Sequence, residues 1–295
     1  MRILITGSNG MLGSDLVQTL SASHEVFGAG LHANKHPQIG YEQTDITNKN
    51  AVLKTITKLK PAIIVHAAAY TDVDGCELNP KQAFLVNTKA VEFIVEAANQ
   101  NGAVLFFVST DYVFDGTQKE PYTETDQPNP VSVYGKSKYE AEEYIKATSH
   151  SAWIIRTSWL FGRNGKNFFR TMTRLFSEKN ELSVVNDQKG APTYTQDLAF
   201  GISELIRKAE RIKGWRTYHL ANAGSTTWYD AALHLAKLAG TSIRIKPITS
   251  EQLKRPARRP NYSVFNLSKI KNDFGIELRP WNEALDYYWT VERGL

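Results

Sequence analysis

The chain has 295 residues, 42% of them hydrophobic and 22% charged, which is an ordinary composition for a globular protein with a substantial core. Its net charge of +5 is dispersed, apart from a small basic cluster at residues 254–259, so we expect a small anionic ligand and no nucleic-acid partner. The single cysteine, Cys76, excludes an internal disulfide, and there is no leader pattern or apolar run of membrane-spanning length. These features predict a cytoplasmic protein that makes no contact with a membrane.

The first predicted strand, residues 2–6, runs into a glycine-rich turn and then into an amphipathic helix that continues to Leu20. Gly7 permits a tight turn, Gly10 lets the backbone approach a diphosphate, and Gly13 lets the helix pack on the strand. The N-terminus of the helix supplies N–H groups and a positive dipole end. This order of elements predicts a dinucleotide-binding site.

The second predicted strand covers residues 25–29, and a dinucleotide-binding protein commonly places an acid after it to hold the adenosine ribose. Residues 30–35 contain no acid and offer His32 and Lys35 instead. Without a carboxylate a 2′-phosphate is not repelled, and nearby cationic groups attract it. The sequence therefore favours NADPH over NADH, although His32 and Lys35 could simply be solvated loop residues.

Two continuous apolar runs, residues 62–65 and 104–108, are expected to form central parallel strands covered on both faces. Doubly wound sheets bind ligands at the carboxyl ends of such strands. The small residues Ala67-Ala68-Ala69 follow the first run, and the polar residues Ser109-Thr110-Asp111 follow the second. His66 is expected to pack or to form a hydrogen bond, because no second metal ligand has suitable spacing. A ligand site is therefore predicted at this edge of the sheet.

A predicted helix over residues 131–147 carries Tyr134 and Lys138 one turn apart on the same face. A neighbouring ammonium favours a phenolate, so we expect Lys138 to lower the pKa of Tyr134 and to make its phenol a stronger acid. Such a tyrosine can exchange a proton with a carbonyl or an alcohol. The alternative is an ordinary surface pair, which the spacing alone does not exclude.

Strands and helices continue to alternate, which predicts an α/β fold with a Rossmann-type doubly wound parallel sheet and a smaller C-terminal α/β substrate-binding region. We expect residues 1–157 to form the NAD(P)-binding domain, with later strands contributing to it, and residues 158–295 to form mainly the substrate-binding region, interleaved with that core. Further strands are predicted at 153–157, 182–185, 217–220 and 243–246, helices at 81–101, 167–176, 195–209, 227–239 and 282–292, and a long loop at 247–262.

Together these motifs resemble the extended short-chain dehydrogenase/reductase family. Three further runs, which begin at Arg156, Val185 and Arg258, narrow the resemblance to dTDP-4-dehydrorhamnose reductases. The resemblance covers essentially the whole chain. It implies that NADPH or NADH reduces a 4-keto sugar nucleotide in the last step to dTDP-L-rhamnose.

The motifs and the resemblance together assign roles to individual residues. The catalytic residues are expected to be Thr110, Tyr134 and Lys138. The expected cofactor-binding residues are Gly7, Asn9, Gly10, Met11, Leu12, Gly13, His32, Asp45, Ile46, Ala67, Ala68, Ala69, Asn87, Val108, Tyr134 and Lys138. The expected substrate-binding residues are Thr110, Asp111, Tyr134, Trp159, Asn167, Arg258 and Arg259.

Some members of the family form metal-bridged dimers through carboxylates, and Asp15 falls at one of those positions, with a shorter side chain than the family's glutamate. The other carboxylates have no identifiable counterparts. We therefore predict no metal ligand, leave Mg²⁺ open, and expect a monomer or a homodimer.

Two other functions remain open. One is a sugar-nucleotide epimerase or dehydratase of the same superfamily, and the other is a non-catalytic nucleotide-binding regulatory subunit. The complete set of Thr110, Tyr134 and Lys138 argues against the regulatory subunit, because a binding module needs no acid. The three downstream runs favour the reductase over the epimerase or dehydratase.

Overall fold

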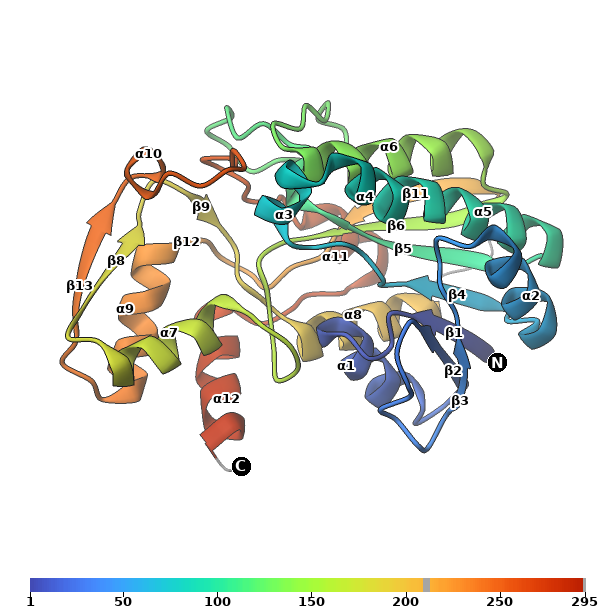
Figure 1. Ribbon diagram of the computed structural model, residues 1–295, viewed down its shortest axis with the longest axis horizontal. Coiled ribbons are helices and arrows are strands. Elements are labelled where there is room, and N and C mark those ends of the chain that lie inside the picture. Colours follow the sequence, from blue (N-terminus) through green and yellow to red (C-terminus); the bar gives the residue numbers. More distant parts are fainter. Residues whose placement is uncertain (209–212, 294–295) are drawn as a thin grey trace.

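The computed structural model describes residues 1–208 and 213–293, and it is built around a twisted sheet with helices on both faces (Figure 1). The sheet has seven strands in the order β11-β6-β5-β4-β1-β2-β3, and all neighbouring strands are parallel. This arrangement confirms the predicted Rossmann-type fold. The strands are β1 Arg2–Thr6, β2 Glu25–Gly30, β3 Gly40–Gln43, β4 Ile63–His66, β5 Val104–Thr110, β6 Ser151–Thr157 and β11 Gly214–His219.

Helices cover both faces of this sheet, and each face has its own hydrophobic core. One face carries α2 Lys49–Leu59, α5 Ala90–Asn101 and α6 Val133–Thr148, and the other carries α1 Met11–Leu20 and α8 Thr195–Lys208. Side chains of Asn48 and Ser132 cap the N-termini of α2 and α6 by accepting backbone N–H bonds. Because α8 and β11 come late in the chain, residues beyond 158 complete the N-terminal sheet.

A smaller region lies at one end of the sheet, at the left of Figure 1. Its strands β8 Glu181–Val185 and β13 Arg244–Ile248 pair in parallel, apart from the main sheet. Their apolar side chains pack with α7 Phe168–Glu178, α9 Trp228–Ala239 and α12 Trp281–Arg293 in a third core. This region is the smaller C-terminal α/β part that the sequence predicted. Two pairs of short strands lie between this region and the main sheet. Strand β7 Leu160–Phe161 pairs with β10 Thr193–Tyr194, and β9 Lys189–Gly190 pairs with β12 Thr226–Thr227.

Some elements differ from the predictions. The helix expected at 81–101 comprises α4 Pro80–Phe84, a π-helical turn η1 Leu85–Lys89 and α5. The loop expected at 247–262 contains one short helix. Ala209, the expected end of the helix at 195–209, lies outside the described residues. Elements that the sequence did not predict are the short strands β7, β9, β10 and β12 and the helical segments α3 Val73–Leu78, η2 Asp111–Val113, α10 Ser250–Leu253 and α11 Ser268–Phe274.

Among the described helices, none has both the length and the apolar character needed to cross a bilayer.

Candidate active site

A cavity of about 730 Å³ opens at the carboxyl ends of the central strands and extends to the smaller region. It brings together residues that lie far apart in the sequence, as expected for a doubly wound sheet. Most of the site residues predicted from the sequence line this cavity, and they are Gly7, Asn9, Gly10, Met11, Leu12, His32, Asp45, Ile46, Ala67, Ala68, Ala69, Val108, Thr110, Asp111, Tyr134, Lys138 and Trp159.

Five predicted site residues are not among those that line this cavity, and they are Gly13, Asn87, Asn167, Arg258 and Arg259. Asn167 caps α7 by accepting the Arg170 N–H at 3.0 Å, and its amide donates to the Gly162 carbonyl at 2.8 Å. Gly13 packs α1 closely on the glycine turn, because a Cβ there would lie 2.0 Å from the Gly7 carbonyl oxygen. The role expected of Gly13 in helix packing is therefore visible in the structure.

The dinucleotide end of the cavity is formed by the glycine turn and the N-terminus of α1. Gly10 is the N-cap residue and has no side chain to bond the first-turn N–H groups, so these groups at Met11 and Leu12 remain available to an anionic group in the cavity. The Asn9 amide donates to the Ala33 carbonyl at 2.9 Å, and its oxygen accepts the Lys35 N–H at 3.1 Å. The turn and helix dipole therefore fit a diphosphate.

The loop after β2 forms the wall beside this end. His32 and Lys35 both line the cavity and both are exposed. The Tyr41 hydroxyl donates to the His32 carbonyl at 2.5 Å, which fixes the loop from the neighbouring strand β3. The two side chains thus lie on the wall of the cavity beside the glycine turn.

Thr110, at the end of β5, and Tyr134 and Lys138, on α6, all line the cavity. The Thr110 hydroxyl is a hydrogen-bond partner of the Tyr134 phenol. The Lys138 ammonium is buried, donates to the Val108 carbonyl at 2.8 Å, and lies 4.0 Å from the centroid of the Phe107 ring. Tyr134 and Lys138 therefore lie on the same face of α6, as their sequence spacing predicted.

The expected lowering of the Tyr134 pKa by Lys138 is wrong. Burial raises the pKa of Tyr134 above its ordinary value. Burial also lowers the pKa of Lys138 to about 7, so this lysine is a weak source of positive charge near neutral pH. Burial of the phenol therefore has a larger effect on the pKa of Tyr134 than the neighbouring lysine has. Tyr134 retains its proton at neutral pH.

His66 lies next to this group at the end of β4, and it is buried. Its Nδ1 is 2.6 Å from the Thr6 hydroxyl oxygen, and its ring stacks on Phe107. Burial, with Lys138 nearby, lowers the pKa of His66 to about 3, so the imidazole is neutral. His66 therefore packs and forms a hydrogen bond, as predicted.

Asp111 is buried beside Thr110, whose hydroxyl donates to its carboxylate at 3.2 Å. Burial raises the pKa of Asp111 to about 7, although hydrogen bonds from Ser263, Thr110 and Trp159 act in the opposite direction. At this pKa the carboxyl exchanges between its neutral and charged forms close to neutral pH. Asp111 is thus a second group in the cavity that can hold a proton.

Trp159 and Trp228 form a flat aromatic wall at the substrate end of the cavity. Their ring centroids are 3.8 Å apart and their planes are inclined by 7°. Gly190 lies against the Trp159 ring, where a Cβ would approach the ring carbon Cε2 to 2.5 Å. The sequence analysis missed Trp228 because its stacking on Trp159 depends on tertiary contacts that no local pattern shows.

Arg259 lies just behind the cavity wall. Its guanidinium donates two hydrogen bonds to the Asp74 carboxylate, from Nη1 to Oδ1 at 3.1 Å and from Nη2 to Oδ2 at 3.0 Å. It also forms a hydrogen bond with Tyr112, which lines the cavity. Burial acts to raise the pKa of Asp74, but the hydrogen bonds from Arg259 and from the Ala257 N–H hold it below the usual range. Arg258 is exposed on the same loop. Asp74 was not identified from the sequence.

Asn87 holds the backbone that forms the middle of the cavity. Its side chain accepts the Tyr70 N–H at 2.7 Å and donates to the Tyr70 carbonyl at 3.0 Å and to the Ser137 hydroxyl at 3.0 Å. Ser137 in turn donates to the Tyr134 carbonyl at 2.8 Å. Asn87 therefore ties the loop after β4 to the helix that carries Tyr134.

In the described part of the chain, no group of three His, Cys, Asp or Glu side chains is arranged to hold a metal ion. Asp15 is buried on α1, which packs against α8.

The seven-stranded parallel sheet, the glycine turn at its first helix and the Tyr134/Lys138 pair define a dinucleotide-binding protein of the short-chain dehydrogenase/reductase type. A sequence model for the RmlD substrate binding domain matches residues 1–292. This chain belongs to that family.

Similar proteins agree with this assignment. The chain is 39% identical to a dTDP-4-dehydrorhamnose reductase of Aggregatibacter actinomycetemcomitans, over 96% of this chain and 97% of the relative. It is 36% identical to the spore coat polysaccharide biosynthesis protein SpsK of Bacillus subtilis, over 97% of this chain and 96% of the relative. A crystal structure of a dTDP-4-dehydrorhamnose reductase from Bacillus anthracis, in complex with NADP, superposes with a TM-score of 0.90 at 35% identity, covering 98% of this chain and 99% of that one.

Proposed function

We propose that this protein reduces the 4-keto group of a dTDP-linked sugar, converting dTDP-4-dehydro-L-rhamnose to dTDP-L-rhamnose with NADPH or NADH. The observation that carries the proposal is the meeting of Thr110, Tyr134 and Lys138 in one cavity with a glycine turn and a helix N-terminus. The names of the similar proteins support the substrate. The NADP in the Bacillus anthracis structure supports the cofactor.

The glycine turn and Lys138 would hold a nicotinamide cofactor, which would supply a hydride for C4 of the sugar. Tyr134 donates a proton to the carbonyl oxygen. Its raised pKa keeps the phenol protonated at neutral pH but also makes it a weaker acid, so the donation depends on groups that stabilise the phenolate. Thr110, whose hydroxyl bonds to the phenol, would donate to the same carbonyl oxygen in place of Asp111. Lys138 holds the nicotinamide ribose and, when charged, stabilises the phenolate that remains.

We further propose that Trp159 contacts the sugar ring and that Arg258 or Arg259 binds the diphosphate. Trp159 lines the cavity and is stacked in place by Trp228. A guanidinium offers planar paired donors that match phosphate oxygens, and Arg259 reaches the cavity wall through Tyr112. The protein is proposed to act in the cytoplasm as a monomer or homodimer without a resident metal ion. Size-exclusion chromatography with and without Mg²⁺ tests the last two statements.

The experiment that tests the function follows the absorbance of NADPH during incubation with a panel of 4-keto sugar nucleotides. A reductase consumes NADPH in proportion to product, whereas an epimerase or dehydratase recycles its cofactor and a regulatory subunit consumes none. In the Tyr134→Phe variant, turnover should fall by about 10²- to 10⁴-fold, because that is the usual contribution of a general acid, while cofactor affinity stays the same. Near-normal turnover in this variant would remove Tyr134 from the proposed chemistry.

A further inference from the structure

A second cavity, of about 640 Å³, has no described lining residue in common with the first. It lies between the edge strand β11, the last turns of α6 and the loop at residues 124–128. Among the described residues its lining is strongly cationic, with five basic side chains against two acids. The basic residues are Lys146, Arg156, Lys213, Arg216 and Lys269, and the acids are Glu124 and Asp126.

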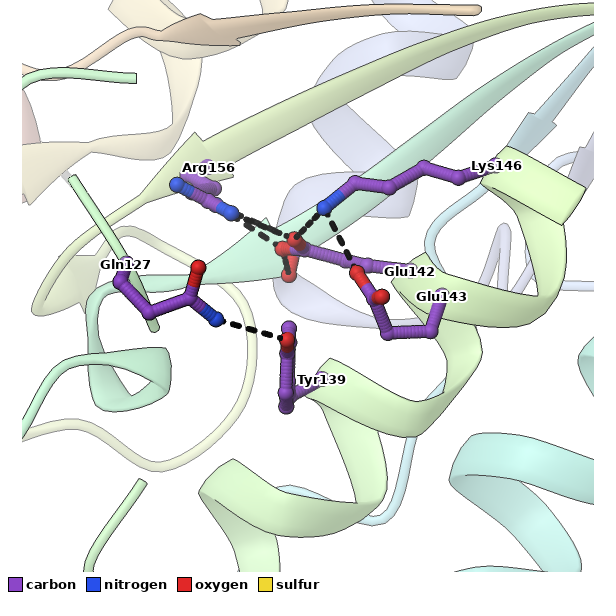
Figure 2. A network of polar contacts seen from close by, with 7 residues as sticks. Gln127, Tyr139, Glu142, Glu143, Lys146 and Arg156 are labelled. Carbon is purple, nitrogen blue, oxygen red and sulfur yellow. Dashed lines mark hydrogen bonds and ion pairs between the residues drawn. The ribbon is translucent and has the colours of Figure 1, made fainter. Parts of the chain in front are cut away.

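Arg156 lines this cavity, and one of its guanidinium nitrogens has no hydrogen-bond acceptor among the described residues. It is 1% exposed, and its Nε and Nη2 donate to the Glu142 carboxylate at 3.0 and 2.6 Å. Its Nη1 is buried and has no acceptor among the described residues. Figure 2 shows the Glu142 carboxylate on one side of the guanidinium, with another guanidinium nitrogen facing away from it. A buried charged donor without an acceptor is costly, so an oxygen ligand here would stabilise the protein.

The two acids that line the cavity already have partners of their own. Glu124 accepts the His219 N–H at 2.9 Å. Asp126 accepts both the N–H and the hydroxyl of Thr123, at 2.6 and 2.9 Å, and the bond from the N–H holds the pKa of Asp126 below its usual value. Glu124 nevertheless interacts electrostatically with Arg156, so the two acids offset part of the positive charge of the lining and leave an excess of basic side chains.

The cationic side chains surround Arg156 from several elements. Lys146 comes from α6, where it pairs with Glu143 at 2.8 Å and lies 3.8 Å from Glu142 (Figure 2). Lys269 comes from α11 and donates to the Thr217 carbonyl at 2.8 Å, while Arg216 is exposed on β11. Basic side chains from separate elements thus line the same cavity as the buried guanidinium.

We propose that this second cavity binds a small phosphate-bearing anion, of the size of inorganic phosphate or diphosphate. The planar guanidinium of Arg156 supplies a directed donor, and the lysines supply point charges that tolerate several oxygen positions. The cavity is much too small for a nucleic-acid duplex. The bound oxygen takes the Arg156 Nη1 hydrogen bond, and the remaining negative charge faces the lysines.

Trp215 provides a fluorescence signal for a test of this proposal, because it lines the cavity and is 39% exposed. The centroid of its ring lies 5.3 Å from the Lys146 Nζ. The whole chain would be titrated with inorganic phosphate and, separately, diphosphate, at constant ionic strength and with excess NADP⁺ present to occupy the first cavity. Calorimetry would measure binding, and tryptophan fluorescence would locate it, with Trp215→Phe as the variant that loses the signal. We expect saturable binding of at least one of these anions.

The Lys213→Ala/Arg216→Ala double variant replaces exposed residues and should weaken binding by about tenfold or more. The matched control is Arg174→Ala/Arg244→Ala, which removes two exposed arginines far from the cavity and should bind like the unmodified protein. Arg156→Lys keeps a charge beside Glu142 but removes Nη1, and its binding should weaken as well, in a variant whose circular dichroism is unchanged. The proposal is overturned by an absence of saturable binding, or by equal affinity in the double variant and its control.

Discussion

Arg259 and Asp74 form a two-point ion pair at the edge of the candidate active site, although they are separated by 185 positions in the sequence. The pair fixes the guanidinium beside Tyr112, a residue of the cavity wall. It thereby joins α3 of the first half of the chain to the loop that follows β13.

The first prediction concerns substrate affinity. If Arg258 or Arg259 binds the diphosphate, Arg258→Ala/Arg259→Ala should raise the KM for the sugar nucleotide about tenfold or more, or roughly 1.4 kcal/mol, without changing cofactor binding. Steady-state kinetics at low and moderate salt measure this. Arg255→Ala is the matched control, because Arg255 also pairs with Asp74, at 3.4 Å, but is largely exposed. An unchanged KM in the double variant would place the diphosphate elsewhere.

The aromatic wall gives the second prediction. Trp159→Ala should weaken binding of the sugar nucleotide and leave binding of the bare nucleoside diphosphate almost unchanged, because only the sugar loses its contact. Trp228→Ala should act in the same direction, since Trp228 holds the Trp159 ring in position. Calorimetric titration with both ligands separates the two effects. Trp215→Ala, far from this wall, serves as the control, and a loss of affinity for both ligands would contradict the assignment of Trp159 to the sugar.

Cofactor preference is the third prediction. NADPH should be used at least as well as NADH, because the loop after β2 presents His32 and Lys35 to the cavity. His32→Asp should shift the preference toward NADH by repelling the 2′-phosphate. The ratio of kcat/KM for the two cofactors is the measurement. His24→Asp, an identical substitution outside the cavity, controls for the added charge, and a strong natural preference for NADH would refute the argument.

The fourth prediction concerns stability and pH. The folded-state pKa of Asp111 is raised to about 7, so between pH 4 and 7 the folded protein retains a proton that the unfolded chain has lost. The stability that this proton contributes is complete below about pH 4 and is lost as pH rises through 7. The Asp111→Asn variant has no carboxyl at this position and should not lose this stability. Its free energy of unfolding, relative to that of the unmodified protein, should therefore rise with pH by at most about 1.4 kcal/mol per pH unit.

Urea unfolding at several values between pH 4.5 and 7.5 measures this difference. Asp115→Asn is the control, because burial acts to raise the pKa of Asp115 but the Thr117 hydrogen bonds hold it below its usual value. That carboxylate is ionised in both states across this pH range, so the control difference should stay nearly constant. A parallel trend in the two variants would contradict the titration assigned to Asp111.

Local patterns predicted the features that depend on neighbours along the chain. The strand and glycine turn at residues 2–13, the helical spacing of Tyr134 and Lys138, and the strand end at Thr110 all follow from periodicity and turn chemistry. The topology of a doubly wound sheet then brings strand ends together, which explains why most predicted residues line one cavity. The substrate end was predicted mainly by family resemblance.

Features that depend on packing could not be predicted in the same way. The stack of Trp228 on Trp159, the pairing of Asp74 with Arg259 and the buried Glu142–Arg156 pair join residues far apart in sequence. The direction of the Tyr134 pKa also required the structure, because burial outweighs the neighbouring charge that the spacing suggested. Burial is a property of the whole fold, and no local spacing reports it.

The late position of β11 has a consequence for protein synthesis. This strand pairs with β6, and α8 covers the face of the sheet whose buried core extends to Leu278, whereas the buried core of the other face uses no residue beyond Ile154. A nascent chain that ends near residue 157 exposes the unpaired edge of β6 and an apolar face, which favours association with other chains. We therefore expect the cofactor pocket, although it is built mostly from early residues, to form only when most of the polypeptide has left the ribosome.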